Sequence, residues 1–180
     1  MKTLKKLLYC SLICIAALFT SCSSDDNGGD NGDTGNNGAA EFLTAKIDGA
    51  DFAASQDPAV LVGAQMAAQG GTTVVVVQGS DNNGNAINFS IFNYEGVGTY
   101  TTGDGPTNSN LIQYLTVSPF AAWGSNLATS LVGGLTPGEI IITSDDGTTI
   151  EGTFSFEGYN ADNMTTKTIT EGEFKANFDN

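Results

Sequence analysis

Cys22 is the residue whose setting points most directly to a chemical reaction, the acylation of its thiol. Three lysines lie within the first six residues, an apolar run covers residues 7–19, and two small residues precede the cysteine. This order is typical of a bacterial lipoprotein signal. An ordinary secretory signal is the alternative, because Phe19 stands where lipoprotein signals usually have Leu. We expect residues 1–21 to be a cleaved signal peptide and Cys22 to be the lipidated N-terminus.

The lipid, and not a helix, is the expected membrane anchor. The apolar run has 13 residues, whereas a spanning helix needs roughly 20. Two or more acyl chains hold a protein stably at a bilayer. After the cysteine, the rest of residues 22–40 consists of Ser, Thr, Gly, Ala, Asn and Asp with no large apolar side chain, which predicts a disordered linker. Residues 41–180 then form one folded domain.

The residue types missing from the mature chain exclude several kinds of chemistry. It has no histidine, no arginine and no cysteine other than Cys22. Ser-His-Asp catalysis, imidazole or thiolate metal sites and disulfides are therefore excluded. Three lysines remain against all 20 acidic residues, a formal charge of −17 that repels nucleic acid. We expect no cofactor, no metal and no nucleic-acid partner.

Carboxylates are the remaining candidates for acid–base chemistry, and their positions favour turns and solvated faces. Asp145 and Asp146 are adjacent in a predicted hairpin turn, so their side chains diverge. Glu151 and Glu157 are six residues apart on one predicted strand, at about 3.3 Å per residue. That separation is too large for a glycosidase pair, which needs ~5–9.5 Å. Residues 81–85 resemble a calcium loop but lack its Gly and its closing Glu. We expect a protein that is not an enzyme.

Aromatic residues near predicted loops form the candidate binding site. Trp123 lies in residues 119–137, for which a short helix, an irregular strand and a loop all remain open. Tyr100 and Tyr114 lie in or near other loops. Aromatic side chains flanked by Asn, Ser and Asp suit neutral sugars, which they bind by stacking and hydrogen bonds. We name Trp123, Tyr100 and Tyr114 as candidate ligand-binding residues. The alternative places Trp123 in the core, where it closes one end of the domain.

The elements that must position these residues are strands, because apolar residues recur with a period of two from Phe42 onward. Hairpin turns are predicted at Asp48-Gly49, at residues 81–85 and at residues 145–147. The predicted strands cover residues 42–47, 72–78, 86–94, 111–117, 139–144, 148–157 and a last segment that contains residues 169–178.

Short strands at this spacing predict an all-β fold, a two-sheet antiparallel β-sandwich, with a barrel-like arrangement as the alternative. The apolar residues of the last strand change parity across Gly172, which predicts a bulge there. In residues 148–157, Phe154 is expected to face the core and Thr153 the opposite side. The predicted core contains Ile47, Val75, Val77, Phe89, Ile91, Ile141, Ile150, Phe154, Phe156 and Phe174.

Two segments of the chain resemble the ends of a known family. Residues 42–49 (FLTAKIDG) and residues 150–156 (IEGTFSF) followed by residues 169–174 (ITEGEF) are similar to an uncharacterised family of Bacteroidota surface lipoproteins with one small β domain. The resemblance covers about residues 42–178 and brings no catalytic residues with it. In that phylum an acidic stretch after the lipidated cysteine, here residues 23–26, resembles an export signal. The resemblance implies a lipid-anchored protein on the outer membrane that faces the cell exterior.

Three functional hypotheses follow from the sequence. The first is a non-catalytic, surface-tethered module that binds an extracellular glycan, peptide or protein. The second is a structural or adhesive envelope component that pairs through sheet edges. The third is a hydrolase that depends on carboxylates. The expected partners are the membrane, through the lipid on Cys22, and a neutral glycan or a protein, with the oligomeric state left open.

Overall fold

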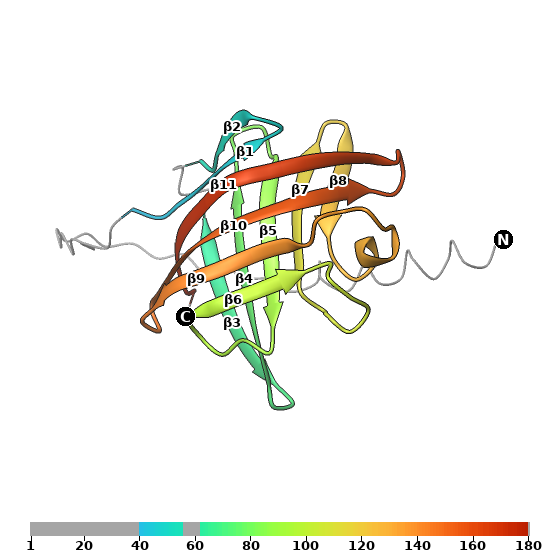
Figure 1. Ribbon diagram of the computed structural model, residues 1–180. Helices are drawn as coiled ribbons and strands as arrows, with labels where there is room; N and C mark the ends of the chain where they lie inside the picture. The colour runs from blue at the N-terminus through green and yellow to red at the C-terminus, as the bar shows by residue number, and fades with distance from the viewer. Residues whose placement is uncertain (1–39, 56–61, 180) are drawn as a thin grey trace, which may run out of the picture. The chain divides into compact units, whose positions relative to one another are not determined.

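The computed structural model describes residues 40–55 and 62–179 (Figure 1). The expected signal peptide, Cys22 and the linker up to residue 39 lie outside the described residues. In the described part, no helix is both long and apolar enough to cross a membrane. The elements are β1 (Phe42–Ile47), β2 (Ala50–Ala53), β3 (Gly63–Gln69), β4 (Thr72–Ser80), β5 (Ala86–Phe92), β6 (Gly98–Thr102), β7 (Leu111–Val117), β8 (Phe120–Ser125), η1 (a 3-10 helix, Thr129–Leu131), β9 (Gly138–Asp145), β10 (Thr149–Asn160) and β11 (Thr165–Asn177).

The described strands form one antiparallel sheet with the order β2-β1-β11-β10-β8-β7-β5-β4-β3. The long strand β10 pairs with β9 over Ile150–Ser155 and with β8 at Tyr159, and β9 continues to β6. A parallel bridge between Ala64 and Phe178 brings β3 back to the end of β11. The sheet is thereby curled into a half-barrel. The all-β antiparallel prediction is confirmed, and the curled sheet resembles its barrel-like alternative.

The core lies between two layers of this curled sheet. In Figure 1, strands β6, β9, β10 and β11 pass in front of β3, β4, β5 and β7 and cross them at a steep angle. Phe89 of the back layer lies 5.0 Å from Phe174 and 6.1 Å from Phe154 of the front layer, measured between ring centroids. These rings therefore join the layers at the centre of the domain.

The predicted core is confirmed except at Ile141. All the other predicted core residues are buried, whereas Ile141 is half-buried and its neighbours Ile140 and Ile142 are buried. Register explains the error, because residues directly opposite each other share a face of the sheet. Ile140 lies opposite the inward Phe154, and Ile141 lies opposite the outward Thr153. Ile140, Ile141 and Ile142 are consecutive, so no alternation of apolar and polar residues indicates which of them faces the core.

The predicted bulge is present in β11, at Glu171-Gly172 against β1 and at Thr170-Glu171 against β10. Phe154 lies opposite Gly172 and Phe156 lies opposite Ile169, so Ser155 faces two residues of β11. The left-handed residue is Glu171, with φ 51°. Gly172 is needed for a different reason, since a side chain there would overlap the ring of Phe154.

The predicted hairpins at Asp48-Gly49, at residues 81–85 and at residues 145–147 all form. Residues 119–137, which the sequence left open, contain strand β8 and the 3-10 helix η1. The short strands β2, β3 and β6 were not predicted. Each is four to seven residues long, and β3 lacks a period-two apolar pattern.

Candidate functional site

Two aromatic rings stack inside one end of the half-barrel. Tyr114 on β7 lies directly opposite Trp123 on β8, with the ring centroids 6.0 Å apart and the planes at 25°. Phe52 on β2 packs edge-on against Tyr114, 6.1 Å away. The exposed fractions of Tyr114 and Trp123 are only 9% and 8%. We call this end of the half-barrel the mouth, and its aromatic floor is Phe52, Tyr114 and Trp123.

A lysine lies over this floor. The Lys167 ammonium is 5.1 Å from the centroid of the Trp123 ring, close enough for a cation–π interaction. Lys167 is two residues from the buried Ile169, so both side chains point to the same face of β11. The Trp123 indole also donates a hydrogen bond of 2.9 Å to the Thr165 hydroxyl. The ring is therefore fixed from two sides by the start of β11.

Asp48 holds the lysine in place. Its carboxylate lies 2.8 Å from the Lys167 ammonium and accepts a second bond from the Thr168 backbone N–H. These two contacts, the Lys167 bond first, lower the pKa of Asp48 below its usual value. Asp48 occupies the tight β1–β2 turn, with φ 50°, and Gly49 follows with φ 84°. Both residues are left-handed, as a type I′ turn requires.

Burial raises the pKa of the Tyr114 hydroxyl above its usual value. The charge of Lys167 opposes this effect, and the charges of Asp81 and Asp48 add to it. Residues from β7, β11, the β1–β2 turn and the β4–β5 turn thus act on one phenol. The mouth is therefore assembled from segments that are far apart in the chain.

The rim of the mouth includes an exposed apolar hairpin tip beside an amide-rich turn. Phe120, at the β7–β8 tip, is 70% exposed, and Val117 opposite it is 54% exposed. Val117 packs over Gly84 of the β4–β5 turn, where a Cβ would lie 3.1 Å from a Val117 methyl group. In the same turn the amides of Asn82 and Asn83 are exposed. Stacking and hydrogen-bonding groups therefore adjoin one another on this rim.

The three aromatic residues named from the sequence do not form one site. Tyr114 and Trp123 are together in the mouth, but Trp123 lies in a strand and is buried, which favours its alternative placement in the core. Tyr100 stacks instead on Tyr94, 5.6 Å away at 23°. Its hydroxyl donates to the Gly96 carbonyl at 2.7 Å.

The sequence analysis did not predict the ion pair between Lys167 and Asp48 at the mouth. Lys167 lies on the inner face of β11, with its ammonium over the Trp123 ring. The signal was present in the sequence, since Lys167 has the same parity as the apolar Ile169. Lys46 and Lys175 do lie on the outer face, where each is ion-paired.

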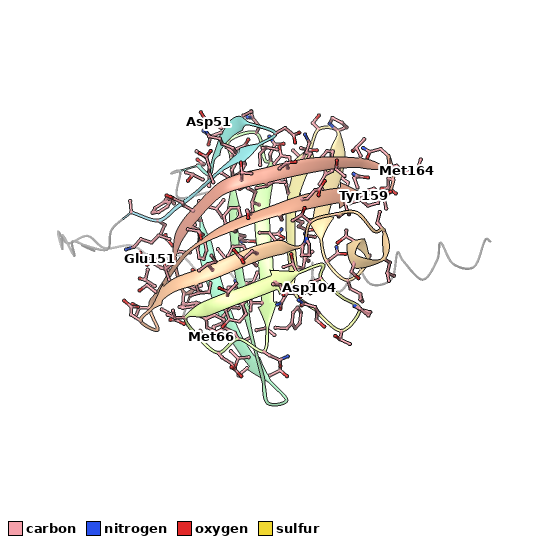
Figure 2. The ribbon with its side chains drawn as sticks, viewed as in Figure 1. Asp51, Met66, Asp104, Glu151, Tyr159 and Met164 are labelled. Atoms are coloured by element: carbon pink, nitrogen blue, oxygen red, sulfur yellow. The ribbon has the colours of Figure 1, made fainter. Side chains whose placement is uncertain are left out.

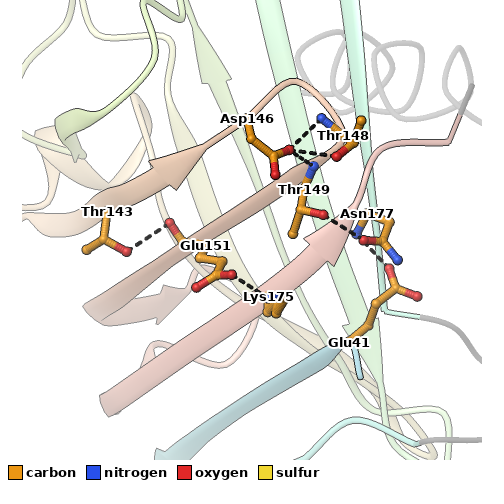
Figure 3. A network of polar contacts seen from close by, with 8 residues as sticks. All are labelled: Glu41, Thr143, Asp146, Thr148, Thr149, Glu151, Lys175 and Asn177. Carbon is orange, nitrogen blue, oxygen red and sulfur yellow. Dashed lines mark hydrogen bonds and ion pairs between the residues drawn. The ribbon is translucent and has the colours of Figure 1, made fainter. Parts of the chain in front are cut away.

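The carboxylates of the predicted turns are occupied by hydrogen-bond donors. Asp146 accepts bonds from the Thr148 N–H and hydroxyl and from the Thr149 N–H (Figure 3). The Thr148 bonds, with that from Thr149, lower the pKa of Asp146 to about 2. Asp145 accepts a bond of 2.6 Å from the Tyr94 hydroxyl. Asp81 accepts from Asn83 and Asn85, the pattern of a polar turn.

Acidic side chains gather on the outer face of the front layer. A shallow hollow of about 350 Å³ is lined by Glu139, Glu171 and Glu173, with Ile141 and Thr153 among its other residues. All three glutamates are exposed to solvent. Among the described residues, no group of three His, Cys, Asp or Glu side chains is arranged to hold a metal ion.

Comparison with known proteins identifies the family to which the chain belongs. A family model described as a domain of unknown function (DUF6252) matches residues 42–176, and the chain belongs to this family. The match confirms that the resemblance seen in the sequence is to an uncharacterised family. No curated protein and no solved structure matches the chain.

Proposed function

We propose that this member of the DUF6252 family is a non-catalytic binding protein, tethered to the outer membrane through a lipid on Cys22 and facing the cell exterior. Its ligand is uncharged, and a neutral glycan is the class that the rim suits best. The observation that carries the proposal is the exposed Phe120 ring at the β7–β8 tip, where its partner Val117 packs over Gly84 of the turn that holds the exposed Asn82 and Asn83. A ring for stacking and amides for hydroxyl groups are the two contacts that a neutral sugar needs.

The charges of the described domain support a neutral ligand. Each of the three lysines in the described residues is ion-paired: Lys46 with Asp51 and Glu171, Lys167 with Asp48, and Lys175 with Glu151. A phosphate or sulfate group at the mouth would have to compete with Asp48 for Lys167 and would meet the charge of Asp81. Desolvating such an anion without a free cation is unfavourable.

The tether is supported by the signal pattern before Cys22 and by the polar linker that follows it. The resemblance to Bacteroidota surface lipoproteins supports the outer face of the outer membrane.

The test is a glycan array with neutral and sulfated members, probed with the lipidated protein in detergent. Phe120→Ala removes the exposed ring, and Val97→Ala is the matched control, since Val97 is 63% exposed on the β5–β6 connection. We expect neutral glycans to bind the wild type and the Val97 variant, and binding to fall at least tenfold in the Phe120 variant. Tenfold corresponds to about 1.4 kcal/mol, within the range of a lost stacking contact.

Two results would overturn the proposal. Preferred binding of sulfated glycans contradicts the electrostatic argument. Equal loss of binding in the Phe120 and Val97 variants contradicts the placement of the site at the mouth.

A further inference from the structure

Three strands of the described sheet have an edge, and two of these edges are protected. Strand β2 has four residues and carries Asp51, and a short, charged edge resists pairing with another chain. On β6 the outward carbonyl of Thr101 accepts hydrogen bonds from the side-chain amides of Asn108 and Asn110, at 2.7 and 3.0 Å. A loop of the same chain therefore covers that edge.

The edge of β3 has no such protection beyond its first residues. The Ala64 carbonyl accepts a bond of 2.9 Å from the Asp179 N–H, so the outward backbone groups of Ala64 are directed away from β4. Along an antiparallel strand, every second residue directs its backbone N–H and C=O groups to the same side. The backbone groups of Met66 and Ala68 therefore also point away from β4. No described residue pairs with them there, and the side chains of residues 65–68 are all exposed.

The edge of β3 carries no charged side chain. Residues 58–80 contain no charged side chain, although the mature protein carries a formal charge of −17. Natural edge strands are commonly guarded by lysine, proline or inward charges, and β3 has none of these. The β3–β4 hairpin extends below the other strands in Figure 1, and Figure 2 shows Met66 near its base.

We propose that β3 is a dimerisation edge, which pairs antiparallel with β3 of a second copy about a twofold axis at Ala67. In this register Met66 lies opposite Ala68 of the second copy. By the twofold symmetry, Ala68 lies opposite Met66 of the second copy. Each of the two pairs exchanges two backbone hydrogen bonds. The bond between Ala64 and Asp179 is left intact, so the domain itself need not rearrange.

A second copy is the occupant that the charges favour. The approaching surfaces carry no charged side chain, so their pairing brings no like charges of this acidic domain into contact. At the axis, Ala67 meets its own copy, and two methyl groups permit the close approach of a non-hydrogen-bonded pair, about 4.5 Å between Cα atoms. The dimer is independent of ligand binding at the mouth, and it suits the second functional hypothesis, a component that assembles through sheet edges.

The register gives a specific test in the full-length protein on intact cells. Ala67→Cys places two thiols across the axis at a separation that a disulfide spans. In Gln65→Cys, the matched control, the two thiols are about 13 Å apart along the strands. Cys22 is acylated in the lipidated protein and does not compete. Under mild oxidation we expect a cross-linked dimer on a non-reducing gel for the Ala67 variant and none for the Gln65 variant.

Light scattering of the lipidated protein in detergent gives a second measure. Met66→Lys places like charges beside the axis, and Val97→Lys is the control at a site of similar exposure. We expect the wild type and the Val97 variant to be dimers and the Met66 variant to be a monomer with unchanged circular dichroism. A monomeric wild type, equal cross-linking of the two cysteine variants, or a Met66→Lys protein that stays dimeric would overturn the proposal.

Discussion

Phe154 on β10 lies directly opposite Gly172 on β11, and its ring covers the glycine where a side chain would otherwise stand. Two residues earlier, β10 supplies the glycine and β11 the ring. Gly152 lies opposite Phe174, and the Phe174 ring covers it. The two phenylalanines are 6.4 Å apart between centroids, and both contact Phe89 of the other layer. Two cross-strand Phe–Gly pairs therefore form the centre of the core.

Gly172→Ala should destabilise the domain by about 1–3 kcal/mol, because the new methyl group overlaps the Phe154 ring and the Phe154 carbonyl. Gly105→Ala is the control, since nothing lies within 4 Å of a Cβ at that position. Urea unfolding of the two variants measures the difference. Equal midpoints would show that the ring does not occupy this space.

Phe154→Ala should cost ~3–5 kcal/mol of unfolding free energy, because the side chain is only 3% exposed and a cavity remains when it is removed. Thr153→Ala, on the outer face of the same strand, should cost far less. Thermal unfolding of both variants tests the assignment of the two faces. Similar shifts in melting temperature would contradict it.

Asp146→Asn should remove a pH-dependent part of the stability. The pKa of Asp146 is about 2 in the folded protein and 3.8 without these contacts, because N–H and hydroxyl groups of Thr148 and Thr149 bind the charged form. A carboxyl group with a lowered folded-state pKa stabilises the fold above the unfolded pKa, and this contribution is lost as the pH falls through the folded pKa. The stability advantage of the wild type over the variant should therefore shrink between about pH 5 and about pH 2.

Urea midpoints of the two proteins across this range provide the measurement. A difference that stays constant with pH would mean that the Asp146 contacts do not depend on its charge.

Cys22→Ala should release the protein from the membrane. Only the acyl chains are expected to hold so acidic a protein at a bilayer. Intact-mass analysis and cell fractionation of wild type and variant provide the measurement. Equal masses, with both proteins in the soluble fraction, would refute the lipoprotein assignment.

The sequence by itself determined the secondary structure of the regular strands, because alternation and turn residues are local signals. Period-two patterns placed Phe154 and Phe156 inward, and Asp48-Gly49 specified a type I′ turn. Where the local signal was absent, prediction failed. Ile140, Ile141 and Ile142 gave no alternation, and only pairing with β10 decided which of them faces inward. Lys167 has the same parity as the buried Ile169, and this local signal does indicate the inner face.

The tertiary structure alone decided which residues meet. Trp123 and Tyr114 lie opposite each other because β7 and β8 pair, and Lys167 reaches Trp123 because β10 joins β8 to β11, with Gly158 opposite Lys167. The open edge of β3 likewise depends on the strand order, which places β3 at the end of the sheet. Local sequence sets the direction of each side chain, but the long-range hydrogen bonds between strands set their neighbours. Nearly every residue has the same backbone donor and acceptor. The identities of the side chains therefore predict the pairing of strands only weakly.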